Sequence, residues 1–306
     1  MNINHLRLFL RVASTHNISL AGEELGISPA VASSHLNKLE QSLGVRLIHR
    51  TTRSVSLTSE GQAFLHHAED VISSIESAKA SVGAGLSKPS GTLRVAAPAS
   101  FGRMHLLPQL TQFMDENPNL KIDLKLSDTI VDLVEGGFDV AIRNSELKDS
   151  SLVAKKLVND KRVLCASPTY LAKYGCPKTP EDLKSHNCIT LMNLDHWSFK
   201  KGNELNSIKV HGNFRTDNGE AIRDACTNGL GITINSTWSA YNQLASGELI
   251  EVLPEYPLVH QAAIWAVYPS SRQLAPKVRA FIDYFSHYFS EETYWDNVIA
   301  KSKSKK

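Results

Sequence analysis

The stretch that decides the fold is Ser19-Leu-Ala-Gly-Glu-Glu-Leu-Gly-Ile-Ser-Pro-Ala-Val-Ala-Ser-Ser-His-Leu-Asn-Lys-Leu-Glu40. Ser19 can cap a helix that stops at Gly26, because a serine hydroxyl accepts hydrogen bonds from first-turn N–H groups and glycine readily forms the left-handed turn after a helix. Ser28 then caps a second helix, with Pro29 at a first position where no N–H is needed. The pattern predicts two short helices joined by a tight turn.

The second helix, which we expect to end at Gly44, separates an apolar face from a polar one. Its apolar residues recur at helical spacing and mark the buried face: Ala32, Leu36, Leu39 and Leu43. Short hydrogen-bonding side chains near a helix N-terminus suit contact with base edges and phosphates. The candidate DNA-reading residues on this helix are Ser28, Pro29, Ala30, Ser33, Ser34, His35, Asn37 and Lys38.

Two strand-like segments follow, Val45–Arg50 and Val55–Thr58, around a polar turn, which is the pattern of a β-wing. We expect Arg50 and Arg53 to contact DNA phosphates, because basic residues outnumber acidic ones locally. Helical hairpins with a solvated polar face are common. The geometry alone therefore leaves DNA binding and an ordinary hairpin about evenly matched.

A long amphipathic segment follows the wing and reaches about residue 83. Its apolar residues recur every three or four positions: Phe64, Leu65, Ala68, Val71, Ile72, Ile75, Ala78 and Val82. Such a stripe must be buried, and a second copy of the same helix is the simplest partner. Packing against the chain's own wing domain is the alternative. The residues from Gly83 to Gly91 have the composition of a flexible hinge.

As a set, these residues resemble the N-terminal domain of LysR-type transcriptional regulators. The matching features include Leu25-Gly-Ile-Ser-Pro29, Leu39-Glu40, Leu43-Gly44 and Leu57-Thr-Ser-Glu-Gly61. The resemblance implies a winged helix-turn-helix DNA-binding domain over 1–58 and a linker, or dimerisation, helix with a hinge over 59–90. Ser34-His35 departs from the family's Arg- or Gln-bearing pair, which leaves the target sequence open.

From Gly91 onward, strands alternate with helices, and the order βαβαβ predicts a parallel sheet with helices on both faces. The expected strands are Thr92–Ala97, Leu120–Leu126, Phe138–Arg143, Lys161–Ala166, Cys188–Leu191, Ser207–Phe214, Gly231–Ile234 and Ile264–Val267. The expected helices are Arg103–Glu116, Thr129–Glu135, Pro168–Tyr174, Asn218–Asn228, Thr237–Ala245 and Pro276–Phe289.

This second part resembles the effector-binding domain of the same regulators, whose two α/β lobes are like those of type 2 periplasmic binding proteins. Gly91-Thr-Leu-Arg-Val-Ala-Ala-Pro-Ala-Ser100, Phe138-Asp-Val-Ala-Ile-Arg143 and Gly229-Leu-Gly-Ile232 carry the resemblance. It implies an effector domain over 91–306. Lobe I takes 91–160 and 265–292, lobe II takes 161–264, and a basic tail covers 293–306. We expect its last six residues, Lys301–Lys306, to be a disordered, solvated end rather than a phosphate contact.

Ligands of such sheets bind at the carboxyl ends of the strands, between the lobes. Ser100 ranks first, because it matches the family's commonest inducer contact and suits an anion. Arg143 can hold a carboxylate bidentately, with an ion pair to Asp128 or Asp139 as the alternative. The candidate ligand contacts are Ser100, Phe101, Thr129, Arg143, Asn144, Asn193 and Asn218, of which Thr129 and Asn218 can equally be helix N-caps.

Composition and motifs exclude several classes of protein. The chain has a net charge of +2, with 42% hydrophobic and 21% charged residues, so it can bury large cores. It shows neither a signal peptide nor a membrane-length apolar run, and we expect a bacterial, cytoplasmic, nucleoid-associated protein. Four cysteines, Cys165, Cys176, Cys188 and Cys226, lack zinc-ligand spacing. With no catalytic or phosphate-loop motif, we expect no enzyme activity, cofactor or metal.

The sequence therefore predicts a regulator of transcription that binds double-stranded DNA and responds to a small polar or anionic inducer. We expect a homodimer through the linker helix, assembled into a homotetramer, with RNA polymerase as a candidate partner. The sharpest alternative input is cysteine oxidation, because Lys173, Lys178 and Lys184 lie near Cys176 and Cys188 in the sequence. A solute-binding protein would leave the N-terminal 83 residues unexplained, and an architectural DNA binder would not need the cleft domain.

Overall fold

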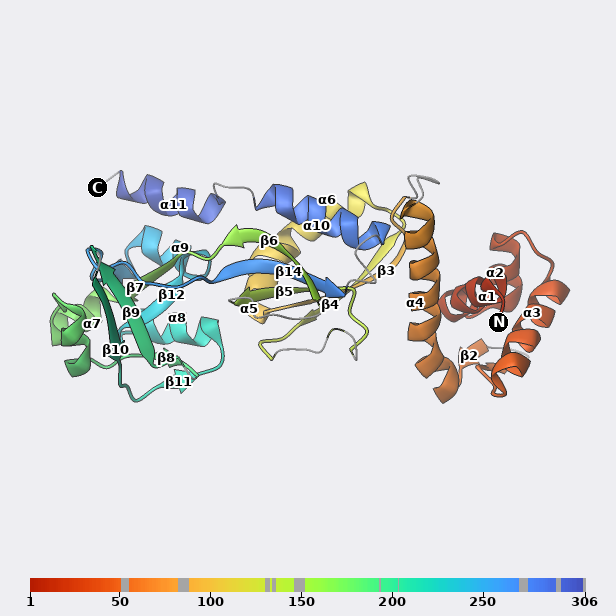
Figure 1. Ribbon diagram of the computed structural model, residues 1–306, viewed down its shortest axis with the longest axis horizontal. Coiled ribbons are helices and arrows are strands. Elements are labelled where there is room, and N and C mark those ends of the chain that lie inside the picture. The colour runs from red at the N-terminus through yellow and green to blue at the C-terminus, as the bar shows by residue number, and fades with distance from the viewer. Residues whose placement is uncertain are drawn as a thin grey trace. The chain divides into compact units, whose positions relative to one another are not determined.

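A computed structural model of the chain describes residues 1–50, 55–81, 88–129, 133, 136–145, 152–192, 194–202, 204–269, 275–289 and 293–304. The chain divides into two compact units (Figure 1). The first is built mainly from Met1–Lys88, and the second from Pro89–Ser270 together with Lys277–Lys306.

The first unit has the predicted helices and wing. Its elements are α1 (Ile3–Thr15), α2 (Ile18–Glu24), α3 (Pro29–Leu43), β1 (Ile48–Arg50), β2 (Val55–Leu57) and α4 (Ser59–Ser81). β1 and β2 pair antiparallel, as a wing requires. The predicted cap of the first short helix was wrong. Asn17, and not Ser19, caps α2, because its side chain accepts from the Leu20 N–H at 3.1 Å and the helix begins at Ile18.

The core of this unit joins α4 to the helices that precede it. Buried residues from α1, α2, α3 and the wing form one cluster, which also takes in Ala68 of α4. The ring of Phe64 lies 5.5 Å from that of Phe9 on α1. The first half of the α4 stripe therefore packs on its own domain, as the alternative interpretation expected. Val71 and Ile3 stay exposed, so part of the apolar surface remains uncovered.

Glu40 fixes the wing against α3. Its carboxylate is buried, with the residue only 8% exposed, and it accepts from the N–H groups of Leu47 at 2.8 Å and Ile48 at 3.1 Å. Thr58 completes the junction, since its hydroxyl donates to the Arg46 carbonyl at 2.7 Å and accepts from the Gly61 N–H at 2.8 Å. These bonds set the position of the wing relative to α3 and cap the start of α4.

The second unit contains a five-stranded sheet in the order β4-β3-β5-β14-β6, which defines the first lobe. Its strands are β3 (Gly91–Ala97), β4 (Leu120–Leu126), β5 (Val140–Ser145), β6 (Leu152–Asn159) and β14 (Ala263–Pro269). β3 runs parallel to β4 and β5, whereas β14 runs antiparallel to β5 and β6. The prediction of a parallel sheet is therefore confirmed for β3, β4 and β5 but wrong for β14, which is antiparallel to its neighbours. β6 was not predicted.

Helices cover this sheet, and a continuous helical segment opens directly after β3. It comprises α5 (Ala99–Phe101), a π-helical turn (Gly102–Leu106) and α6 (Leu107–Glu116), so the helix expected from Arg103 begins one turn earlier. α6 and α10 (Pro276–Tyr288) lie on one face of the sheet (Figure 1). The helix expected over Thr129–Glu135 falls mostly outside the described residues.

The second lobe is built on a mixed set of short strands. β7 (Arg162–Ala166) pairs antiparallel with β12 (Thr233–Ser236) and β13 (Ile250–Glu251), and β8 (Thr190–Leu191) pairs parallel with β11 (Arg215–Thr216). The hairpin of β9 (His196–Lys201) and β10 (Glu204–Lys209) replaces part of the strand expected over Ser207–Phe214. Its helical elements are α7 (Pro168–Tyr174), a 3-10 turn (Pro180–Ser185), α8 (Gly219–Thr227) and α9 (Thr237–Ser246).

The expected disordered end, Lys301–Lys306, is helical over Lys301–Lys303, which corrects that part of the prediction. Residues Tyr294–Lys303 form α11, which packs on α9. Trp295 is buried there, and Lys303 pairs with Glu251 of β13 at 2.8 Å. The lysines dominate the sequence of this segment, but the aromatic pair at its start supplies the surface that anchors it.

The Glu40 junction can be tested by removing its carboxylate. We expect Glu40→Ala to lower the free energy of unfolding of the first unit by about 3 kcal/mol, because two buried N–H groups lose their acceptor. Urea unfolding followed by circular dichroism measures the change. Glu23→Ala, at an exposed position of α2, is the control and should change stability by less than about 0.5 kcal/mol. Equal effects of the two variants would contradict the role given to Glu40.

Candidate DNA-reading helix and effector cleft

α3 presents the predicted reading residues on one exposed face. The Ser28 hydroxyl accepts from the Val31 N–H at 3.4 Å, and Pro29 occupies the first turn, as predicted. The opposite face is buried through Ala32, Leu36 and Leu39. The exposed predicted residues are Ser28, Pro29, Ala30, Ser34, Asn37 and Lys38, while Ser33 and His35 are half-buried. The burial of one face leaves the other one free for a groove.

His35 differs from its neighbours because it lies against α1. The centroids of the His35 and His5 rings are 4.5 Å apart. Burial lowers the pKa of His5, and repulsion from His35 and Lys38 lowers it further. His35 is thus held at the edge of the reading face rather than standing clear of it.

The wing carries exposed basic side chains, although not all of the predicted ones are described. Arg46 and His49 are exposed. The backbone of Arg50 lies in β1, while its side chain and the whole of Arg53 are outside the described residues. The described basic residues at this surface are therefore Lys38, Arg46 and His49.

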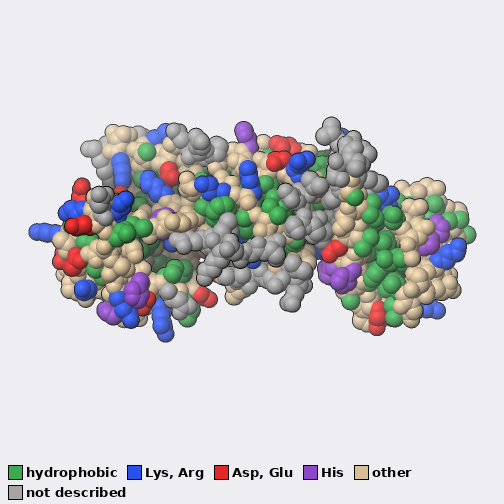
Figure 2. All heavy atoms as spheres, in the orientation of Figure 1, with side chains coloured by type: hydrophobic (Ala, Val, Ile, Leu, Met, Phe, Trp, Pro, Cys, Tyr) green, Lys and Arg blue, Asp and Glu red, His purple; other side chains and the backbone are tan. Residues whose placement is uncertain are grey.

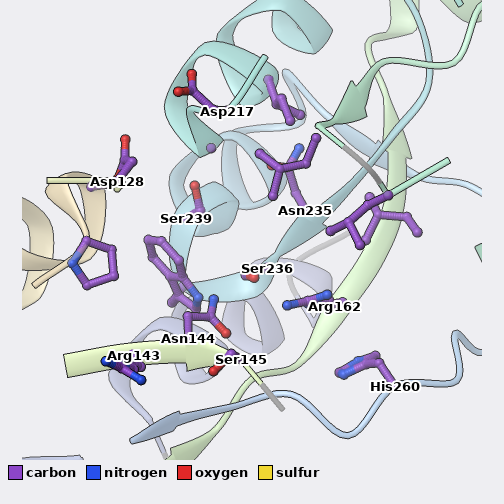
Figure 3. A pocket seen from close by; sticks show the side chains of 18 of the residues that line it. Asp128, Arg143, Asn144, Ser145, Arg162, Asp217, Asn235, Ser236, Ser239 and His260 are labelled. Carbon is purple, nitrogen blue, oxygen red and sulfur yellow. The ribbon is translucent and has the colours of Figure 1, made fainter. Parts of the chain in front are cut away.

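The second unit contains a cleft of about 550 Å³ between its two lobes (Figure 3). The first lobe lines it with the carboxyl ends of β3, β4 and β5, as expected for such sheets. The second lobe lines it with the ends of β7 and β12 and the first turn of α9. Of the predicted contacts, Ser100, Thr129, Arg143 and Asn144 line the cleft.

The remaining predicted contacts lie elsewhere. Phe101 is fully buried and does not line the cleft, which corrects that prediction. Its ring packs 5.3 Å from Trp238 and 5.4 Å from Phe289, because the residue after Ser100 in a helical turn faces the core. Asn218 also does not line the cleft. It caps α8 by accepting from the Ala221 N–H at 2.9 Å. Asn193 lies outside the described residues.

Asn218 also links the two lobes at the edge of the cleft. Its side-chain amide donates to Asp128 of the first lobe at 2.6 Å, and Asp128 accepts from the Ala99 N–H at 2.9 Å as well. Arg103 of the π-helical turn pairs with Glu220 of α8 on the same side. These bonds connect the helical segment after β3 to α8.

Arg143 has no ion-pair partner among the described residues, and neither alternative pair is formed there. Asp139 instead pairs with Lys277 at 2.7 Å and accepts from the Arg94 N–H at 2.9 Å. By contrast, the second arginine of the cleft, Arg162, pairs with the buried Asp160 at 2.7 Å. The guanidinium of Arg143 is therefore the one most suited to an external anion.

Several buried polar atoms on the cleft wall lack a partner among the described residues. They are Ser100 Oγ, Asn144 Oδ1, Trp238 Nε1 and Ser239 Oγ, and all four residues line the cleft. A buried donor or acceptor without a partner costs roughly 1–3 kcal/mol. A cluster of them in one cavity indicates a place that binds a polar ligand.

Trp238 and Ser239 were missed by the sequence analysis. They stand in the first turn of α9, directly after β12. The rule that selected Ser100, that ligands bind where a strand ends and a helix begins, applies equally to this position. The signal was therefore present, but the rule was not applied to the strand expected at Gly231–Ile234.

The cysteines divide into one exposed and three buried thiols. Cys165, Cys188 and Cys226 are buried, whereas Cys176 is exposed. Contact with the Cys165 thiol and burial raise the pKa of Cys226 well above its usual range. Burial raises the pKa of Cys188 to about 12. Thiols with raised pKa values carry little thiolate and react slowly.

This division predicts the order of thiol modification. In the folded protein, Ellman's reagent should modify Cys176 rapidly and the other three cysteines only after unfolding, because the reagent needs an accessible thiolate. Absorbance at the wavelength of the released product follows the reaction. Cys176→Ser should remove the fast phase, and a fast phase that persists in this variant would contradict the assignment.

A helix-turn-helix unit with a wing, joined to a two-lobed domain with a polar cleft, is the architecture of a DNA-binding regulator with an effector-binding domain. Comparison with known families agrees. The family model described as "Bacterial regulatory helix-turn-helix protein, lysR family" matches residues 3–62, and "LysR substrate binding domain" matches residues 87–290. The chain belongs to the LysR family of transcriptional regulators, and it is a regulator rather than an enzyme.

Individual relatives match over most of their length. The chain is 35% identical over 293 residues to the HTH-type transcriptional regulator DmlR of Escherichia coli, covering 94% of this chain and 95% of DmlR. The structure of CrgA from Neisseria meningitidis has a TM-score of 0.62 at 30% identity, covering 95% of this chain and 100% of CrgA. The regulatory domain of AphB from Vibrio vulnificus, treated with cumene hydroperoxide, has a TM-score of 0.53 at 30% identity, covering 65% of this chain and 100% of that domain.

Proposed function

We propose that this regulator reads specific operators in double-stranded DNA through α3 and the wing, and that a small polar or anionic inducer in the cleft controls this binding. The observation that carries the proposal is Arg143, which has no ion-pair partner among the described residues, in a cleft with buried unpartnered polar atoms. We assign DNA binding to residues 1–58, the linker to 59–90 and effector binding to 91–306.

We infer that the protein works as a homodimer through α4, assembled into a homotetramer. Exposed apolar side chains of the first unit support this, since Val71 of α4 and Ile3 of α1 remain uncovered by their own domain. Figure 2 shows hydrophobic side chains gathered on the visible face of this unit. An amphipathic helix whose apolar residues are partly exposed favours packing against a second copy of the chain. RNA polymerase is a candidate partner, and the cytoplasm and the nucleoid are the expected location.

The inducer acts in this proposal by favouring one arrangement of the lobes. It can shift the arrangement only by as much as its affinities for the two arrangements differ. Ser100 and Arg143 contribute from the first lobe, and the end of β12 and α9 from the second. A ligand that touches both walls therefore competes with, or adds to, interlobe bonds such as Asp128–Asn218.

DNA recognition is tested by selecting genomic fragments that bind the purified full-length protein at moderate salt. We expect a compact set of inverted repeats, with half-sites about one helical turn or a multiple of it apart, because a symmetric dimer places two α3 helices in successive major grooves. Recovery of fragments without regard to sequence would instead indicate an architectural binder. No recovery at low salt would contradict DNA binding.

The cleft is tested by substitutions that leave the DNA-binding unit untouched. We expect Ser100→Leu and Arg143→Met to abolish the inducer's effect on operator binding and to leave operator affinity without inducer within about twofold, because both residues line only the cleft. Fluorescence anisotropy of a labelled operator measures both quantities. Arg279→Met, at an exposed position of α10, is the matched control. Loss of operator binding in both cleft variants would contradict the assignment.

Thiol oxidation is the second candidate input, as the peroxide-treated AphB domain suggests. Two contacts favour it in this chain. The Cys226 thiol donates to the Cys165 carbonyl at 3.4 Å, which brings the two cysteines together. The side-chain amide of Asn235, a residue that lines the cleft, donates to the Cys165 sulfur at 3.4 Å. The complete burial of both sulfurs disfavours it. The variant Cys226→Ser separates the two inputs. If it keeps the response to inducer, the ligand remains the input. If it loses a response to peroxide, thiol oxidation is favoured.

A further inference from the structure

We propose that the first turn of α9 is a second acceptor-binding subsite of the cleft, formed by the Trp238 indole N–H and the Ser239 hydroxyl, and that the inducer is therefore a small dicarboxylate. One carboxylate would lie at Arg143 and the other at this subsite. The inference deepens the proposed function and rests on it, since it concerns the same cleft.

The two side chains of the subsite are buried and lack partners. Trp238 is 7% exposed and Ser239 is 4% exposed, and neither Trp238 Nε1 nor Ser239 Oγ has a hydrogen-bond partner among the described residues. Both residues line the cleft. An indole N–H can only donate, so the group that satisfies it must be an acceptor. A ligand that reaches this wall therefore presents an oxygen acceptor there.

The backbone of α9 favours a negative charge at the same place. The first N–H groups of a helix have no partner within it and carry the positive end of its dipole. Ser236 is the N-cap residue, but its side chain makes no capping hydrogen bond and also lines the cleft. The Thr237 N–H is already used by the Lys161 carbonyl at 2.7 Å. An indole donor, two hydroxyls and a helix N-terminus together suit a carboxylate better than a neutral oxygen.

Trp238 is held in position by residues from outside α9. His105 of the first lobe donates from Nε2 to the Trp238 carbonyl at 3.2 Å, and its Nδ1 accepts from the Tyr294 hydroxyl at 2.6 Å. The ring of Phe101 packs edge-on against the indole with 5.3 Å between centroids. Burial lowers the pKa of His105 to about 4, which keeps the imidazole neutral, as these two bonds require. The donor is therefore fixed in place before a ligand arrives.

The facing wall holds the other end of the ligand. Figure 3 shows Arg143 and Asn144 on one side of the cleft, with Ser236 and Ser239 on the elements of the other lobe. Two acidic residues, Asp128 and Asp217, also line the cleft, and they could instead bind an ammonium group. Asp128, however, already accepts from the Ala99 N–H and the Asn218 amide, and Asp217 accepts from the Thr216 hydroxyl at 3.5 Å. The unpartnered groups thus favour two acceptor ends over one acceptor and one ammonium.

Three compounds of four carbons separate these cases: butyrate with one carboxylate, succinate with two, and 4-aminobutyrate with one carboxylate and one ammonium. Isothermal titration calorimetry of the full-length protein measures each affinity. We expect succinate to bind at least roughly tenfold more tightly than the other two, since a second carboxylate gains charge-assisted hydrogen bonds.

The subsite itself is tested by two variants and a control on the same helix. Trp238→Phe and Ser239→Ala should each remove most of the advantage of succinate over butyrate while leaving butyrate affinity unchanged. Ser246→Ala, at the other end of α9, should leave all three affinities as they are. Circular dichroism verifies that each variant is folded, and Ser239→Ala keeps the test valid if Trp238→Phe does not fold.

The outcomes separate this inference from the proposed function. If butyrate and succinate bind equally and both depend on Arg143, the cleft binds anions but the α9 subsite is refuted. If 4-aminobutyrate binds best, the acidic pair reads an ammonium and the dicarboxylate inference is refuted. If none of the three compounds binds, and Arg143→Met does not change the effect of the inducer on operator binding, the anionic inducer and the α9 subsite are both refuted.

Discussion

Buried carboxylates hold together the segments on which both functional parts depend. A carboxylate removed from water is costly unless it is paired and hydrogen-bonded, so each one fixes the groups around it. Glu40 joins α3 to the wing through two backbone N–H groups. Asp139 joins β3 to α10 through the Arg94 N–H and Lys277. Asp160, at the passage from β6 to β7, pairs with Arg162. Glu40 thus fixes the wing beside α3, and Asp139 and Asp160 lie in the domain that contains the cleft.

The cleft is lined by polar groups that have no hydrogen-bond or ion-pair partner among the described residues. In the first lobe, Asp139 and Lys277 satisfy each other, whereas Arg143 at the end of β5 has no ion pair within the described residues. In the second lobe, the Trp238 indole N–H is likewise buried without a partner there. Buried polar groups without partners cost stability in the folded protein. A ligand that satisfies them on both walls at once would recover that free energy and hold the lobes together.

The local elements could be predicted because their signals are local. Ser28-Pro29 and Gly44 bound α3 as predicted, since capping and turn formation depend on a few neighbouring residues. The predicted helix Pro168–Tyr174 has those same bounds as α7. The cap of α2 was misplaced by two residues because Asn17 and Ser19 are both good N-caps, and sequence alone does not decide between them. Thr129 and Asn218 were ambiguous because the same side chain can cap a helix or contact a ligand, and the structure shows Asn218 as the cap of α8.

What depended on long-range contacts could not be read from the sequence. β6 and the antiparallel β14 were missed or misoriented, because strand direction follows from how the chain returns from the second lobe. α11 was not predicted, and its last residues from Lys301 were taken for a disordered end, because its anchoring by Trp295 requires a neighbour, α9, that is distant in the sequence.

The sequence by itself determined the class of protein, the bounds of α3 and the first-lobe strand ends that line the cleft, since these follow from periodicity, caps and motif spacing. Only the tertiary structure decided that Phe101 faces the core, that Arg143 lacks an ion pair among the described residues, and that Trp238 and Ser239 face the cleft. Those facts depend on contacts between side chains that are distant in the sequence, and the spacing of residues along the chain does not specify such contacts.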